Sequence, residues 1–248
     1  MDVDWSMVAR ELQELLKLKS RPVGVKLCRS PEDLEPGTRP SVGVAVCQMV
    51  KGAALAGWTL ACPLELVGCF TAQMILGARP QSEKDTDHHI KQFVESDAVA
   101  KRMADGKPKL GVGEIAGLLA GPLGGFEPDV VLLIVDSLQA MGVIEARARL
   151  AGEELQFSNG VSSAVCSYSV VGPIQTGQIN LSVPCVGARR YAAFQDHELI
   201  LSLPWSEVGA TLDEMKAMEQ AKKWHVPVVN SYLSPTIPIN YLVKPPQP

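Results

Sequence analysis

Pro128-Asp129-Val130-Val131-Leu132-Leu133-Ile134-Val135-Asp136 lies near the middle of the chain and contains an unbroken apolar run. Such a run of aliphatic residues between turn-forming ends is typical of a buried β-strand. A similar run near the N-terminus reads Pro22-Val23-Gly24-Val25-Lys26-Leu27. Each run is followed at some distance by the tripeptide Ala-Val-Cys, which ends at Cys47 in the first case and at Cys166 in the second. Two strands therefore open two similar stretches of sequence.

A second cysteine completes each stretch. Cys62 follows Cys47 and lies in Ala-Cys-Pro, whereas Cys185 follows Cys166 and lies in Pro-Cys-Val-Gly. The number of residues between corresponding positions grows steadily from Val23 and Val130, through Cys47 and Cys166, to Cys62 and Cys185. Insertions between duplicated halves would produce such a trend. We predict a degenerate internal repeat. Its halves would span residues 1–110 and 111–205, and a C-terminal helix with a proline-rich wrap would span residues 206–248.

Helical and strand patterns mix throughout the chain. Residues 3–18 have apolar side chains at helical spacing, and Val42, Val44 and Val46 alternate like a strand that ends at Cys47. Pro63 suits the first turn of a helix that would run to Gly77. We expect Cys62 at the N-terminus of that helix, where the helix dipole would lower its pKa. The fold class is α/β or α+β, with two related halves, mixed sheets and flanking helices.

The bulk composition excludes several classes of protein. The 248 residues carry a formal net charge of −4, which does not favour binding to nucleic acid or to anionic lipid. The N-terminus lacks the basic and apolar regions of a secretory signal, and no apolar run reaches the roughly 18 residues of a membrane-spanning helix. We therefore expect a cytoplasmic protein with six reduced cysteines rather than a disulfide framework.

The four repeated cysteines are candidate metal ligands. If the halves pack about a pseudo-twofold axis, Cys47, Cys62, Cys166 and Cys185 could converge near it, and four thiolates suit an iron–sulfur cluster of the [4Fe–4S] type. Zinc is disfavoured because the tight Cys-x-x-Cys pairs of zinc ribbons are absent. We assign Cys28 and Cys69 to packing, with Cys69 as a substitute ligand. All six thiols could instead be small hydrophobic core residues. Two cysteines from each of two chains would also supply four ligands, so a homo-oligomer is an alternative.

Three functions fit these residues. The first is a redox protein whose cluster transfers electrons to a protein partner or reduces a small molecule bound near Arg189. The second is a cofactor-free binding module that holds a small anion between the halves on Arg189 and Lys26. The third is an enzyme that uses Cys62 or Cys185 as a nucleophile.

An ordered set of motifs resembles the family known as domain of unknown function 169, which occurs widely in anaerobic bacteria and archaea. The resemblance extends from about Leu12 to Pro204. It rests on Arg21-Pro22-Val23-Gly24-Val25-Lys26-Leu27, Cys47, Cys62-Pro63, Pro122-Leu123, Pro128-Asp129-Val130-Val131, Gln139, Ser162-Ser163-Ala164-x-Cys166, Cys185-x-Gly187-x-Arg189 and Asp196-x-Glu198-Leu199. It implies that Cys47, Cys62, Cys166, Cys185 and Arg189 occupy motif positions, and it implies no particular activity.

Overall fold

One antiparallel sheet of six strands organises the chain in the computed structural model, which describes residues 3–221 without the side chains of residues 88–91. The strand order is β2-β3-β1-β4-β6-β5, and every neighbouring pair is antiparallel. The strands are β1 (Val23–Cys28), β2 (Leu60–Pro63), β3 (Gly117–Pro122), β4 (Val130–Val135), β5 (Asn180–Ser182) and β6 (Leu199–Pro204).

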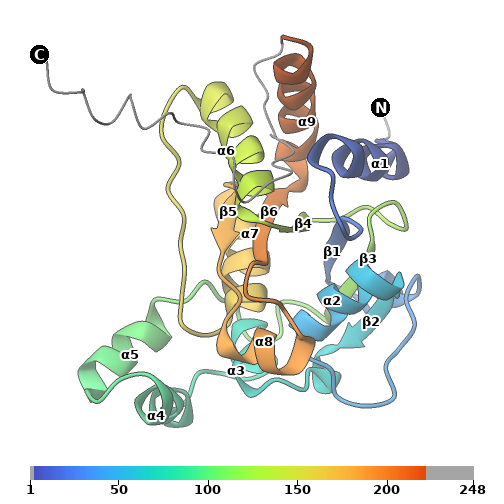
Figure 1. The fold of residues 1–248 in the computed structure, drawn as a ribbon. Helices are drawn as coiled ribbons and strands as arrows, with labels where there is room; N and C mark the ends of the chain where they lie inside the picture. The colour runs from blue at the N-terminus through green and yellow to red at the C-terminus, as the bar shows by residue number, and fades with distance from the viewer. Residues whose placement is uncertain (1–2, 222–248) are drawn as a thin grey trace, which may run out of the picture.

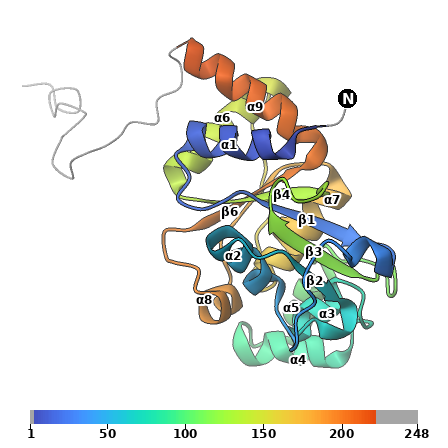
Figure 2. The same cartoon turned by 90° about the vertical axis from the view of Figure 1, so that its right-hand side faces the viewer.

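Helices cover both faces of the sheet, as Figures 1 and 2 show. One face carries α1 (Trp5–Leu16), α6 (Ser137–Ala151) and α9 (Trp205–Gln220). The other carries α2 (Val46–Ala56), α3 (Phe70–Ile75), the π-helix η3 (Ala164–Val171), α7 (Gly172–Thr176) and α8 (Val186–Ala192). The remaining helical segments are α4 (Glu83–Gln92) and α5 (Asp97–Asp105), which pack on each other, and the 3₁₀ turns η1 (Pro31–Leu34) and η2 (Leu64–Leu66).

Strand β4 supplies side chains to both cores. Val130, Leu132 and Ile134 point into the core beneath α2, α3 and η3, whereas Val131, Leu133 and Val135 point into the core beneath α1, α6 and α9. All six residues are buried. Because successive side chains of a strand face opposite sides, only a run that is apolar at every position can lie between two helical layers. The apolar run identified in the sequence is therefore the doubly covered centre of the sheet.

Asp136 ends this strand and begins the next helix. Its carboxylate accepts hydrogen bonds from the N–H groups of Leu138 and Gln139, at 3.0 and 2.9 Å, and the Gln139 side chain accepts one from the N–H of Asp136. This reciprocal arrangement is a capping box. The Gln139 amide also donates to the carbonyls of Leu16 and Lys17 at the end of α1. One buried glutamine thus starts α6 and holds α1 against it.

The predicted mixture of helices and sheet is confirmed, and it takes the α+β form because the strands pair only antiparallel. Strands β1, β2 and β3 form one half of the sheet and β4, β5 and β6 the other, with β1 and β4 paired at the centre. Read outward from this central pair, each half has the order first, third, second. A duplicated unit would give this order, although the common origin of the halves stays a prediction.

The predicted boundary at residue 110 places β3 in the second half, but β3 pairs with β1 and β2. Its pairing partners are thus the strands of the first half. The last predicted region is helical over α9, and the proline-rich segment beyond residue 221 lies outside the described residues. Within the described part of the chain, no helix combines the length and apolarity needed to cross a bilayer.

The central strand provides a test of this architecture. We expect Leu133→Ala to lower the free energy of unfolding by about 3 kcal/mol, because it opens a cavity beneath helices that cannot fully close it. Urea denaturation should report a lower midpoint. Leu150→Ala in α6, where the side chain is 43% exposed, is the matched control and should shift the midpoint little. Equal effects of the two changes would contradict the placement of β4 between two layers.

Candidate functional site

Four cysteines line one cavity of about 410 Å³ on the face of the sheet that carries α2 and η3. They are Cys47, Cys69, Cys166 and Cys185. All six cysteines of the chain are free thiols, and Cys166 is buried whereas the other three in the cavity are partly exposed. The cavity is within the size range of small-molecule sites in proteins.

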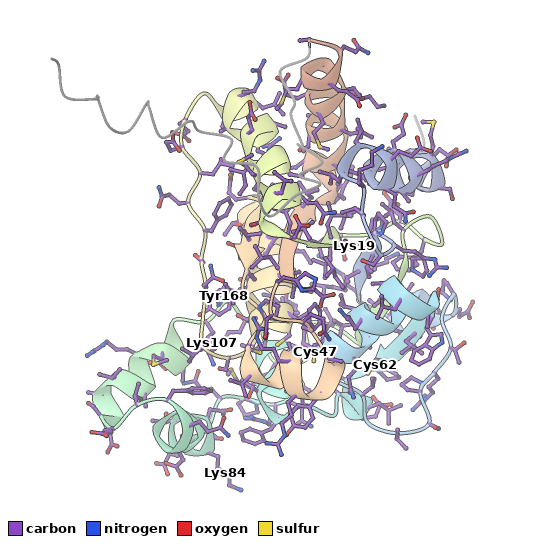
Figure 3. All side chains as sticks on the ribbon, viewed as in Figure 1. Lys19, Cys47, Cys62, Lys84, Lys107 and Tyr168 are labelled. Carbon is purple, nitrogen blue, oxygen red and sulfur yellow. The ribbon has the colours of Figure 1, made fainter. Side chains whose placement is uncertain are left out.

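Each of the four cysteines lies at the start of a helical segment. Cys47 is the second residue of α2, and Cys166 is the third residue of η3. Cys69 immediately precedes α3, and Cys185 immediately precedes α8. Residues that enter a helix are held by its first turn, so these four thiols are fixed by backbone geometry rather than by long side chains. Figure 3 labels Cys47 at the start of α2, close to α8.

The same positions recur in the two halves of the sheet. Cys47 and Cys166 correspond to each other. Each follows Ala-Val and lies at the start of a helical segment that comes before the second strand of its half, which is β2 for Cys47 and β5 for Cys166. The other cysteine of each half precedes the short helix that lies before the third strand, as Cys69 and Cys185 do. The cavity therefore receives two thiols from each half at corresponding points of the topology.

The thiols influence one another electrostatically. Burial, together with the nearby Cys69 and Cys185, raises the pKa of Cys47 to about 12. Burial also raises the pKa of Cys166 well above its ordinary value, with added effects from Cys69, Cys185 and Cys47. Like charges close together oppose ionisation. The four thiols thus lie within interaction range, and a compensating positive charge is needed to ionise them together.

Cys62 lies outside this group. It is buried in β2 opposite Leu118, and its thiol is 3.5 Å from the carbonyl oxygen of Pro63. The expected lowering of its pKa is wrong, because burial raises the pKa of Cys62 to about 11. The helix expected over residues 63–77 is split into η2 and α3, since residues 60–63 pair with β3 instead. Cys69, at the start of α3, takes the place expected for Cys62.

Arg189 and Lys26, the two expected ligand-binding cations, do not line the cavity. The Arg189 guanidinium donates to the carbonyls of Pro184 and Gln195 and forms a 3.0 Å ion pair with Asp196, so it braces the segment around α8. Lys26 lies on β1, with its Nζ 3.8 Å from Asp33. The cation at the cavity is the neighbouring Arg190, which is exposed at its edge.

Polar groups line the cavity beside the thiols. Ser162 and Ser163 line the cavity, and the buried Lys107 donates a 2.5 Å hydrogen bond from its Nζ to the Ser162 hydroxyl. Burial lowers the pKa of Lys107 to about 8, although nearby Cys166 and Asp85 favour its charged form. Figure 3 labels both Lys107 and Cys47 in the lower half of the molecule as drawn. The sequence analysis did not identify Lys107, because a lone lysine in a polar stretch carries no signal.

The residues that the structure describes include no group of three or more histidine, cysteine or acidic side chains that could hold a metal ion. A zinc ion bound to four sulfurs at about 2.3 Å requires those sulfurs to be less than about 4 Å apart. The four thiols thus line a cavity without forming such a compact cage.

Comparison with known proteins places this architecture in a family. The chain is 25% identical over 220 residues to the "Uncharacterized protein MJ0308" of Methanocaldococcus jannaschii, an alignment that covers 86% of this chain and 94% of that protein. No solved structure matches the chain. The model of the family described as "Uncharacterised ArCR", domain of unknown function 169, matches residues 11–214. That match includes all six strands and all four cavity cysteines, and the chain therefore belongs to the domain of unknown function 169 family.

Proposed function

We propose that this protein holds an iron–sulfur cluster of the [4Fe–4S] type through Cys47, Cys69, Cys166 and Cys185, and that it transfers electrons to a redox partner or reduces a small molecule. The observation that supports this proposal is the convergence of four thiols from four separate segments in one cavity. Four cysteines are the usual ligand set of such a cluster. The ligand set differs from the one expected from the sequence only in that Cys69 replaces Cys62.

A cluster and a single ion require different spacings of the thiols. In a cuboidal cluster each cysteine binds a different iron atom, so the sulfurs stand further apart than around one zinc ion. Four thiols around a cavity of about 410 Å³ leave room for the wider arrangement. The positions of these thiols at the starts of helices also suit a cluster, because the first helical turns hold the four cysteines in place around the cavity.

The charges around the cavity are also compatible with an iron–sulfur cluster. Metal binding must displace the thiol protons, and the raised pKa values of Cys47 and Cys166 mean that these protons stay bound until a cation arrives. Lys107 is buried close to the thiols and would offset part of the negative charge of a thiolate-bound cluster. When bound, such a cluster supplies one-electron transfer, with a potential set by burial and hydrogen bonding.

The opening of the cavity fits transfer to another molecule. Phe70, Val186 and Tyr191 line the cavity and are 40%, 60% and 62% exposed, so apolar and aromatic surface borders the thiols. Exposed apolar surface of this kind suits contact with a small molecule or with a redox partner. A cytoplasmic location belongs to this proposal, because reducing compartments keep thiols available as ligands.

The ligand set can be tested by anaerobic reconstitution with iron and sulfide. We expect the full chain to take up about four irons and four sulfides and to become brown, whereas Cys69→Ala should lose the cluster absorption band and most of the iron. Cys62→Ala is the matched control, because Cys62 lies outside the cavity, and it should retain iron and colour. Thermal unfolding of both variants without metal shows whether each one folds.

A colourless full chain without iron would overturn the proposal. If Cys62→Ala lost the cluster while Cys69→Ala kept it, the ligands would be the four cysteines expected from the sequence. The cavity would then not be the cluster site. Uptake of one zinc ion per chain, with no iron, would identify a mononuclear site instead.

A nucleophilic thiol is a weaker alternative, since reactive cysteines have lowered pKa values, whereas burial raises the pKa of the expected nucleophile Cys62 and of the cavity thiol Cys47. With a pKa of about 12, only about one Cys47 molecule in ten thousand is a thiolate at pH 8. We expect iodoacetamide to label Cys47 of the metal-free chain at least about a hundredfold more slowly than a free cysteine, with the rate rising as pH rises. Mass spectrometry of the Cys47 peptide gives this rate, and labelling as fast as a free cysteine would favour the enzyme.

A further inference from the structure

Ser163 has a hydroxyl group without a partner at the wall of the cavity. The residue is 7% exposed and lines the cavity, and its Oγ forms no hydrogen bond with any residue that the structure describes. Buried polar atoms nearly always have a partner, because leaving one unpaired costs about 1–3 kcal/mol. Its backbone has φ of +63°, in the left-handed region that serine rarely adopts. An unpaired group held by an unfavourable backbone is typical of a site that a ligand completes.

More donors lie directly beside this hydroxyl. Ser163 precedes a helical stretch in which α7 continues η3, from Ala164 to Thr176. The first N–H groups of a helix have no partner within it, and the Ser163 side chain does not cap them. Ser163 uses its own carbonyl to accept the N–H of Ser167. The backbone N–H groups of Val165 and Cys166, two residues that line the same cavity, thus have no partner within the helix.

Positive charge lies behind and beside these donors. Lys107 is buried behind Ser162, to which it donates a hydrogen bond. Asp85, the acidic group near Lys107, is engaged by Arg79 through bonds of 2.7 and 2.8 Å, so its charge is largely offset. Arg190 is exposed at the edge of the cavity and forms no ion pair with the described part of the chain. The local charge therefore favours an anion.

We propose that this wall of the cavity binds a small oxyanion, a carboxylate or a phosphate, through the Ser163 hydroxyl, the first N–H groups of η3 and the Arg190 guanidinium. Every group in this set donates hydrogen bonds, which suits oxygen atoms that carry negative charge. Ser163 lines the cavity, and rotation about its Cβ–Oγ bond lets the hydroxyl hydrogen point at a ligand there. This inference rests on the proposed function only in one respect, since the anion would be the molecule that the cluster reduces. Binding itself does not need the cluster.

Titration calorimetry of the full chain with inorganic phosphate and with acetate tests the site, both before and after removal of any metal. We expect saturable binding of at least one anion. Ser163→Ala and Arg190→Gln should each weaken it at least about tenfold, because each removes a hydrogen bond to a charged group. Phosphate binding without acetate binding would identify a phosphate ligand, and the reverse would identify a carboxylate.

Two matched controls exclude nonspecific effects. Ser169→Ala removes another buried hydroxyl without a partner, but Ser169 lies outside the cavity lining. Arg10→Gln removes an exposed cation on α1, which is on the opposite face of the sheet. Both controls should change the affinity by less than about twofold.

The outcomes separate this inference from the cluster. Saturable binding by a chain that takes up no iron would retain the anion site and overturn the cluster, whereas a reconstituted cluster without saturable binding would overturn only the anion site. Equal affinities of the full chain and Ser163→Ala would also overturn it. If Ser163→Ala left the affinity unchanged but shifted the reduction potential of the cluster, the hydroxyl would serve the cluster sulfurs and not an anion.

Discussion

The short contact between β1 and β4 is the junction on which both halves of this fold depend. Only Val23, Gly24 and Val25 pair with β4, whereas all six residues of β1 pair with β3. Beyond this ladder, the N–H of Leu27 is accepted by the Asp129 carboxylate at 2.7 Å rather than by a strand carbonyl. The halves therefore diverge from a narrow centre. Helices must hold them together on each side, and they do so by packing on alternate residues of β4.

A buried ion pair ties the halves together close to the four-cysteine cavity. Lys51 of α2 donates to both carboxylate oxygens of Glu198, at 2.6 and 2.5 Å, and its Nζ lies 4.6 Å from the centre of the Phe194 ring. Lys51 is 8% exposed, and Glu198 precedes β6. Removing one partner of such a pair leaves a buried charge unpaired and costs about 3–5 kcal/mol. The helix that carries Cys47 is thus fixed to the half that carries Cys166 and Cys185, which keeps their relative positions constant.

The cavity combines two chemical characters. Four thiols line it, and burial opposes the ionisation of two of them, Cys47 and Cys166. Hydroxyl and N–H donors lie beside them, and a buried lysine donates to one of the hydroxyls. A metal cluster and a small anion would each relieve one of these unfavourable features. Metal binding would displace the protons of the thiols into solvent. The anion would give the unpaired Ser163 hydroxyl an acceptor.

Local patterns indicated the mixed class of the fold, the buried central strand, and three of the four thiols that line the cavity. Such patterns suffice where the chemistry is local, because an unbroken apolar run must be buried and a residue such as Asp136 caps the helix that follows it. The choice between Cys62 and Cys69 depended on tertiary structure. The backbone groups of residues 60–63 form hydrogen bonds with β3, which is distant in the sequence. This pairing buries Cys62, and the α-helix therefore begins only at Phe70. Lys107 likewise joins the site only through folding, because nothing in a single lysine predicts which cavity it will border.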